Sequence, residues 1–231
     1  MSVQQDKFLA IANKIREKTN TEDLIKPNDF VDKIDDVFEA GKTSEYDRFW
    51  DNLLNYGNAT CTNYLFQSPR WTDEIYNPPY TIKCQTGGGS MTNMYIYTKI
   101  TDTKVPIDMR GSHTNNSFGY GELVTIRKLI VDESTVFADN TFSYAQKLKN
   151  ITFEGTIASN IDFQYSPLTK DSIINIFNAL SSETSGLTLT LKRTAVNTAF
   201  GIDVTDKTTY PEGSEFYNLR HSKDNWTVSC R

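Results

Sequence analysis

Two segments with the same apolar pattern, Ile126-Arg127-Lys128-Leu129-Ile130-Val131 and Leu148-Lys149-Asn150-Ile151-Thr152-Phe153, lie 22 residues apart in the chain. In each segment apolar residues occupy the first, fourth and sixth positions, as in the L-x-x-L-x-L core of a leucine-rich repeat. The fourth and sixth side chains of such a core lie on one face of a short strand. We therefore expect one strand from each segment, with Leu129 corresponding to Ile151 and Val131 to Phe153.

The pattern extends toward the N-terminus as pairs of apolar residues separated by one residue. The pairs begin at Tyr80, Val105, Leu129 and Ile151, in steps of 25, 24 and 22 residues. Bulky apolar residues follow these positions at intervals of 12 to 14 residues and form a second column, Met94, Phe118, Phe142 and Phe163. A unit of this length, one strand and a return segment, cannot bury its apolar face alone. We predict a short, irregular, leucine-rich-repeat-like β solenoid of about four units over residues 80–163.

A different periodicity follows Pro167. Thr169 can cap a helix with an apolar stripe from Ile173 to Leu180, and the leucines of residues 187–191 then alternate as in a strand. A solenoid needs an end unit to cover its last apolar edge, so we expect this helix and strand to form a C-terminal cap. The rest of the chain is typical of loops, with one late strand over residues 226–229.

The N-terminal region is helical in pattern. Phe8, Ile11 and Ile15 recur at helical spacing and are candidate oligomerisation residues. Two further helical patterns cover residues 28–40 and 43–57, and the sequence leaves open whether they form one helix. Helical periodicity ends at Gly57. We therefore expect an α+β protein with a helical attachment region at 1–57, a repeat array at 58–166 and a cap at 167–231.

Charge and hydropathy argue against two classes of partner. The net charge of −5, the pI near 5.1 and the lack of any basic run disfavour nucleic acid. No stretch approaches the ~18 consecutive apolar residues of a membrane span, and no basic segment followed by an apolar one begins the chain. We expect synthesis in the cytoplasm, no membrane partner, and release only by lysis or within a particle. The three cysteines are compatible with one disulfide or with none.

No motif in the chain indicates catalysis, a metal or a cofactor. The two histidines, His113 and His221, have no zinc-ligand spacing, and the Gly87-Gly88-Gly89-Ser90 stretch lacks the lysine of a phosphate-binding loop. Two alternatives stay open. Cys230 and His221 could meet in space as a nucleophile and base, and neighbouring carboxylates such as Asp132 and Glu133 could hydrolyse glycosides. We expect no enzyme activity.

Tyrosines provide the candidate binding surface. The chain has 12 of them, and the candidates, all within the repeats, are Tyr95, Tyr97, Tyr120 and Tyr144. Tyrosine is a rigid, amphipathic side chain that anchors partners at interfaces. The alternative is that alternate members of this set fill the core of the solenoid.

Several segments resemble a known family. Phe8-Leu9-Ala10-Ile11-Ala12-Asn13-Lys14-Ile15-Arg16-Glu17-Lys18-Thr19, followed by Ile25-Lys26-Pro27, resembles a helical module of tail and structural proteins from phages and prophages of Gram-positive bacteria. Phe38-Glu39-Ala40-Gly41-Lys42 and Glu45-Tyr46-Asp47-Arg48-Phe49-Trp50-Asp51 resemble the segment that leads into BspA-like leucine-rich repeats. Thr141-Phe142, before residues 148–153, is similar to the repeat unit itself. Pro167-Leu168-Thr169-Lys170-Asp171-Ser172-Ile173, residues 187–189 and Ala195-Val196-Asn197-Thr198-Ala199-Phe200-Gly201 resemble the C-terminal segment of these proteins.

The resemblance implies a non-enzymatic structural or binding protein. We expect a phage or prophage tail component, in the baseplate or a fibre, that is a homo-oligomer in the virion. It would contact other tail proteins and a glycan or protein of the host surface. The alternative is a bacterial BspA-like adhesin that acts outside the cell without any particle. A carbohydrate-active enzyme with carboxylates brought together by the repeats is a third hypothesis.

Overall fold

The computed structural model describes residues 13, 60–61, 66–84, 90–138 and 140–231 of the chain. The chain divides into two compact units, Met1–Tyr56 and Gly57–Arg231, and the description below concerns the second unit. The candidate oligomerisation residues Phe8, Ile11 and Ile15 and the predicted helices at 28–40 and 43–57 lie outside the described residues.

The first sheet of the solenoid has five parallel strands in the order β1, β2, β4, β6, β8. Their bounds are Thr60–Cys61, Ile82–Cys84, Ile107–Asp108, Thr125–Val131 and Asn150–Gly155. Ile82, Ile107, Leu129 and Phe153 occupy equivalent positions in successive strands, and all four side chains are buried. The strands therefore stack one apolar position above the next, and the α+β solenoid of about four turns is confirmed. The repeat pattern placed Val131, and not Leu129, in line with Ile82, Ile107 and Phe153.

The register within this sheet differs from the prediction. Leu129 pairs with Phe153 and Ile126 with Ile151, whereas the sequence pattern aligned Leu129 with Ile151. A β-bulge between Ile126 and Leu129 shortens the offset between paired residues by one within these two strands. A slip of two residues returns every side chain to the same face of a strand, so the apolar pattern fits either register equally well.

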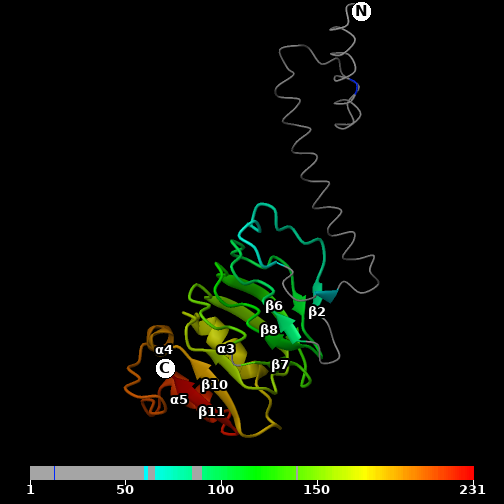
Figure 1. The fold of residues 1–231 in the computed structure, drawn as a ribbon. Helices are drawn as coiled ribbons and strands as arrows, with labels where there is room; N and C mark the ends of the chain where they lie inside the picture. The colour runs from blue at the N-terminus through cyan, green and yellow to red at the C-terminus, as the bar shows by residue number, and fades with distance from the viewer. Residues whose placement is uncertain (1–12, 14–59, 62–65, 85–89, 139) are drawn as a thin grey trace, which may run out of the picture. The chain divides into compact units, whose positions relative to one another are not determined.

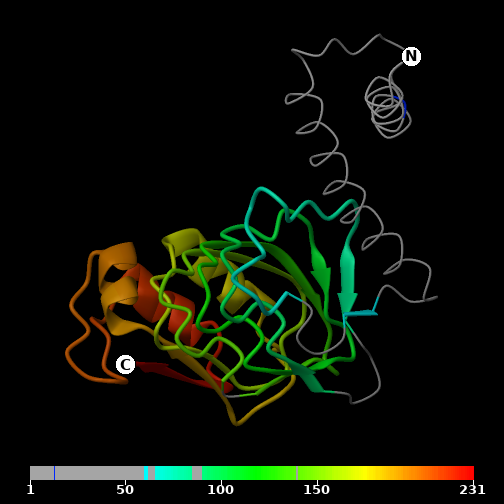
Figure 2. The same ribbon diagram turned by 45° about the horizontal axis from the view of Figure 1, so that its top comes forward.

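Two further parallel sheets complete the turns. One contains β3, β5 and β7, with bounds Ser90–Thr92, His113–Asn115 and Val136–Phe137. The other contains β9, β10 and β11, with bounds Ile161–Phe163, Leu187–Leu191 and Trp226–Cys230. Figures 1 and 2 show the coils of this region, coloured green, stacked over one another. Each turn of the chain thus hydrogen-bonds to the turns before and after it.

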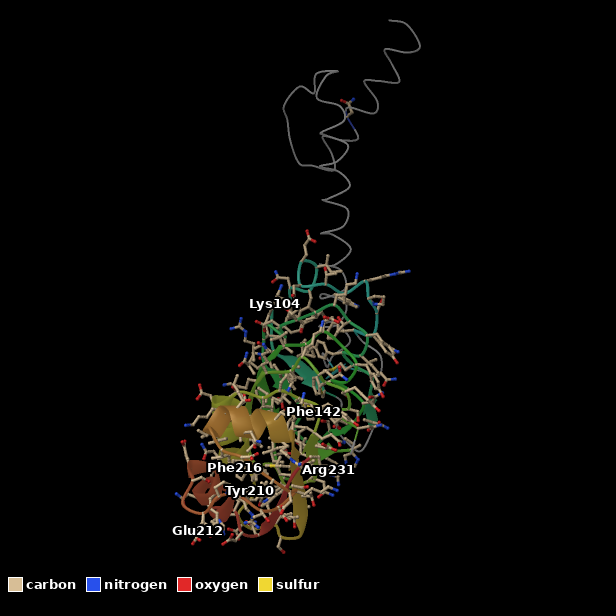
Figure 3. All side chains as sticks on the ribbon, turned by 90° about the vertical axis from the view of Figure 1, so that its left-hand side faces the viewer. Lys104, Phe142, Tyr210, Glu212, Phe216 and Arg231 are labelled. Atoms are coloured by element: carbon tan, nitrogen blue, oxygen red, sulfur yellow. The ribbon has the colours of Figure 1, made fainter. Side chains whose placement is uncertain are left out.

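A continuous column of aromatic rings fills the interior. Tyr95, Phe118, Phe142 and Phe163 follow one another with ring centroids 5.7, 5.3 and 4.5 Å apart. The predicted second column is therefore correct at three positions and wrong at its first, where Tyr95 stands instead of Met94. Met94 is also fully buried, so hydrophobicity alone does not distinguish the two residues. Figure 3 labels Phe142 within this core.

A helix covers the last strand of the first sheet. In α3 (Lys170–Ala179) the Ser172 hydroxyl accepts the Ile151 amide at 2.9 Å, and the Asn175 side-chain oxygen accepts the Phe153 amide at 2.6 Å. The edge of β8 thus bonds to helix side chains instead of to another strand. Figure 1 shows α3 beside β8.

Strand stacking continues after α3. β10 pairs with β9 and β11 pairs with β10, both in parallel. Between β10 and β11 lie α4 (Arg193–Phe200) and α5 (Glu215–His221), in a stretch where the sequence pattern indicates loops. The late strand is present and ends one residue later than predicted, at Cys230. None of the helices in the described part of the chain is long and apolar enough to cross a membrane.

Candidate functional site

Four pentapeptides form one corner of successive turns. Each has an aromatic residue at its third position and a tyrosine at its fifth: Asn93-Met94-Tyr95-Ile96-Tyr97, Asn116-Ser117-Phe118-Gly119-Tyr120, Asn140-Thr141-Phe142-Ser143-Tyr144 and Ile161-Asp162-Phe163-Gln164-Tyr165. The third-position rings make up the buried column. Backbone hydrogen bonds join the turns here, from the Tyr95 amide to the Ser117 carbonyl and from the Phe118 amide to the Thr141 carbonyl.

The backbone turns at the fifth position of the motif. Tyr97, Tyr120 and Tyr144 have φ angles of 58°, 53° and 56°. These values lie in the left-handed region, which bulky residues rarely adopt. In a regular strand the third and fifth side chains would point to the same face. In the first three pentapeptides the left-handed turn instead directs the fifth ring outward while the third stays in the core. Tyr165 is not among the residues with a positive φ.

The outward rings stack into a row that we call the tyrosine ladder, defined as Tyr97, Tyr120, Tyr144 and Tyr165. Successive ring centroids are 5.9, 4.7 and 4.5 Å apart, with interplanar angles of 41°, 30° and 11°. The first three rings expose 56%, 43% and 42% of their surface. Tyr144 stacks on both neighbours, so its exposed surface comes from the ring edge and the hydroxyl. The ladder thus presents edges and hydroxyls to solvent, at the spacing of the coils.

Two hydroxyls of the ladder, those of Tyr120 and Tyr165, have raised pKa values. A hydrogen bond with Tyr144 and the nearby negative charge of Asp162 raise the pKa of Tyr165 above its ordinary value. Desolvation, followed by the neighbouring Tyr144 and Tyr97, raises the pKa of Tyr120. These two hydroxyls are therefore uncharged at physiological pH, and each can both donate and accept hydrogen bonds.

Close backbone contact between turns supports the ladder. A Cβ atom placed on Gly119, the residue before Tyr120, would lie 2.2 Å from the carbonyl oxygen of Ser143, the residue before Tyr144. Real Cβ atoms do not approach oxygen so closely. Glycine at this position therefore allows the coils to approach closely enough for the two rings to stack.

The structure corrects one predicted site residue and adds another. Tyr95 is fully buried, and its hydroxyl lies 2.6 Å from that of Tyr76, so it belongs to the core and not to an exposed surface. Tyr97, Tyr120 and Tyr144 are exposed and adjacent. Tyr165 completes the row, although the sequence analysis did not include it. The signal that could have found it is the repeated aromatic-x-Tyr ending of the pentapeptides.

The alternative catalytic groups have other roles. Cys230 is buried, which raises the pKa of its thiol to about 11, so it is not a thiolate nucleophile at neutral pH. The His221 ring lies against Tyr217, with centroids 4.0 Å apart. Asp132 accepts hydrogen bonds from the Ser134 and Gly111 amides, and its pKa is lowered. A carboxyl group that acts as a general acid needs the opposite shift.

Among residues that the structure describes, no group of three or more His, Cys, Asp and Glu side chains is arranged to hold a metal ion. The partly exposed carboxylates of Asp102 and Asp108 form ion pairs with exposed arginines instead. Asp108 binds Arg110 through two hydrogen bonds of 2.9 and 2.7 Å, and Asp102 pairs with Arg127 at 2.6 Å. Such pairs position the surface charges of the solenoid.

Comparisons with known proteins leave the chain without an assigned family, since no family model, no curated protein and no solved structure matches it.

Proposed function

We propose that this chain is a non-enzymatic binding protein, a phage or prophage tail component of the baseplate or a fibre. In this proposal it is made in the bacterial cytoplasm, assembles with other tail proteins as a homo-oligomer, and contacts a host-surface glycan or protein through the tyrosine ladder. The observation that carries the binding role is the ladder itself, three exposed and stacked tyrosines at one corner of a rigid solenoid.

Two physical properties of the ladder support a recognition role. Soluble proteins rarely leave large aromatic rings exposed in a contiguous row unless the row contacts a partner. Each ring is held by its stacked neighbours and by a backbone that belongs to the solenoid, so little conformational entropy is lost on binding. The interface of such a surface would gain contact area from the ring edges and specificity from the hydroxyls.

The tail assignment rests on the resemblance of the N-terminal and C-terminal segments to phage tail proteins. The repeat-like solenoid is compatible with a leucine-rich repeat and agrees with both the tail protein and the BspA-like adhesin. In the tail proposal the region before Gly57 provides attachment, and Phe8, Ile11 and Ile15 are its candidate oligomerisation residues. In the adhesin alternative the ladder has the same role without any particle.

The binding role is tested with purified protein and bacterial cells. The double variant Tyr120→Ala/Tyr144→Ala should lose most cell-surface binding, measured by fluorescence of the labelled protein on cells of candidate hosts. Tyr217→Ala, in α5 and outside the ladder, is the matched control and should bind as the unmodified protein does. Unchanged binding by the double variant would assign recognition to another surface.

The tail assignment needs a separate test. A chain that lacks residues 1–56 should fail to enter particles while its solenoid stays folded by circular dichroism. Its mass in solution, measured by light scattering, should fall to that of a monomer. Normal incorporation into particles would refute the attachment role. Abundant full-length chain on the surface of cells without any particle would favour the adhesin.

A further inference from the structure

A polar groove lies on the outer side of the third sheet, beside the ladder. Its volume is about 490 Å³. The residues that matter for its chemistry come from three turns of the solenoid and from the end of β11: Ser143, Asn160, Asp162, Gln164, Thr190 and Arg231. In Figure 3 the label of Arg231 lies below that of Phe142, nearer to the C-terminal elements.

Strand alternation explains why this face is polar. Ile161 and Phe163 on β9 and Leu189 and Leu191 on β10 are buried in the core. On β9 the intervening residue Asp162 is partly exposed, whereas Thr190 on β10 is only 6% exposed, and both line the groove. Asp162 pairs in register with Thr190, which places a carboxylate next to a hydroxyl across the two strands.

Backbone and side-chain hydrogen bonds hold the groove in one shape. Asp162 accepts the Gln164 amide at 2.8 Å and the Gln164 side-chain nitrogen at 2.9 Å, so both side chains have fixed orientations. The backbone amide of Arg231 donates to the Leu191 carbonyl at 2.9 Å and ties the end of β11 to β10. The Asn160 side-chain oxygen accepts the Thr188 amide at 2.8 Å, which leaves its side-chain nitrogen to donate.

The lining combines donors and acceptors with little excess charge. Ser143 and Thr190 hydroxyls and the amides of Asn160 and Gln164 can each donate and accept hydrogen bonds. The Asp162 carboxylate and the Arg231 guanidinium offset one another. An apolar ligand would lose hydrogen bonds on entering such a groove, and a polyanion would meet the carboxylate. Vicinal hydroxyl groups, which donate and accept side by side, match this lining.

The groove adjoins the tyrosine ladder. Ser143 and Gln164 immediately precede Tyr144 and Tyr165 in the chain, and the charge of Asp162 affects the pKa of Tyr165. No ladder tyrosine lines the groove itself, so a ligand would reach the last two rings only by extending beyond the groove. In such an arrangement the aromatic rings contact the C–H faces of a ligand, and the polar lining forms hydrogen bonds with the hydroxyls of the same molecule.

We infer that this groove is a saccharide subsite, which binds a neutral, hydroxyl-rich segment of an oligosaccharide. The inference deepens the proposed recognition function by naming the chemical class of its ligand and a second surface that contacts it. Arg231 donates to ring or hydroxyl oxygens, and Thr190 and Ser143 bond to neighbouring hydroxyls. The aromatic ladder continues the contact beyond the groove.

The test measures binding of defined neutral hexasaccharides, cellohexaose, maltohexaose and chitohexaose, with hexagalacturonate as the charged comparison. The full chain, labelled with ¹⁵N, is titrated by NMR. At least one neutral hexasaccharide should bind saturably and shift the amide signals of Thr190 and Arg231. Arg231→Gln should weaken this binding by about tenfold or more, as expected when a charged donor is lost. Thr190→Val, which keeps the shape of the side chain, should weaken it by roughly threefold or more.

Arg110→Gln is the matched control, because it removes a guanidinium from the first sheet, where Arg110 bonds to Asp108. It should leave hexasaccharide binding unchanged. The subsite would be overturned if none of the four probes bound saturably. It would also be overturned if Arg231→Gln bound as well as the unmodified chain, or if the chain preferred hexagalacturonate. If the ladder variant abolishes cell binding while no hexasaccharide binds, the recognition function stands and the subsite fails. If a hexasaccharide binds as predicted while the ladder variant still binds cells, the subsite stands and the recognition role of the ladder fails.

Discussion

Tyr144 and Tyr165 stack face to face, with ring centroids 4.5 Å apart and planes inclined by only 11°. The two residues are 21 positions apart in the chain, and each follows a buried phenylalanine, Phe142 or Phe163, by two positions. The inner phenylalanine pair is also 4.5 Å apart. Stacking of the core thus fixes the spacing of the exposed rings, and the surface inherits its geometry from the interior.

The ladder should contribute to stability through its stacking. Replacing Tyr144 and Tyr165 by leucine, singly and together, should reveal a coupling free energy of about 0.5–1.5 kcal/mol beyond the loss of buried area. Urea unfolding followed by circular dichroism measures it. The Tyr97 and Tyr120 rings, 5.9 Å apart and tilted by 41°, should show a smaller coupling in the same cycle. Equal coupling free energies in the two pairs would mean that the coupling does not come from the stacking geometry.

Gly119→Ala should destabilise the solenoid more than the same change at an open glycine. The new Cβ would lie 2.2 Å from the Ser143 carbonyl, so the coils must separate, and we expect a loss of more than ~2 kcal/mol. Gly186→Ala is the control, because nothing lies within 4 Å of its Cβ position and only its φ of +78° is unfavourable. That change should cost about 1 kcal/mol. Comparable unfolding midpoints in urea would show that the coils adjust without strain.

The contact between α3 and β8 should protect the edge of the first sheet. Ser172→Ala removes the acceptor for the buried Ile151 amide and should cost about 1–3 kcal/mol, the usual penalty for an unsatisfied buried donor. The Ile151 amide should also exchange with deuterium faster than in the unmodified chain. Asn178→Ala, on the exposed face of the same helix, should change neither quantity.

Acid stability should depend on Asp132. Burial alone would raise the pKa of this carboxyl group, but hydrogen bonds from Ser134, Gly111 and Thr135 outweigh it and lower the pKa below its usual 3.8. Its contribution to stability is complete above the unfolded pKa and is lost as the pH falls through the folded one. Asp132→Asn should therefore flatten the pH dependence of the urea midpoint between roughly pH 5 and pH 2. Glu212→Gln, at an exposed loop position labelled in Figure 3, should leave that slope nearly unchanged.

The buried thiols should be unreactive in the folded protein. Cys84 and Cys230 are free and buried, and burial raises the pKa of both. In a Cys61→Ser background, an aromatic disulfide reagent at pH 8 should modify neither thiol until urea unfolds the chain. Rapid modification of Cys230 without urea would show that β11 opens readily from β10.

The sequence by itself determined the solenoid, its approximate period and the helix after Thr169. These features follow from the regular spacing of apolar residues, because the folded chain must bury those side chains. It also identified three of the four rings of the ladder. The register of β6 on β8 was decided only by the tertiary structure, because a slip of two residues preserves the apolar face and the bulge after Ile126 has no signature in hydrophobicity.

The same limit applies to the binding surfaces. Tyr95 and Tyr97 are chemically identical and two positions apart, and only the left-handed backbone at Tyr97 directs one ring into the core and the other to solvent. The groove is also a product of tertiary structure, since Ser143, Asp162, Thr190 and Arg231 come together only when parallel strands stack in register. Periodicity along the chain specifies which side chains are buried. Contact between turns decides which exposed side chains become neighbours.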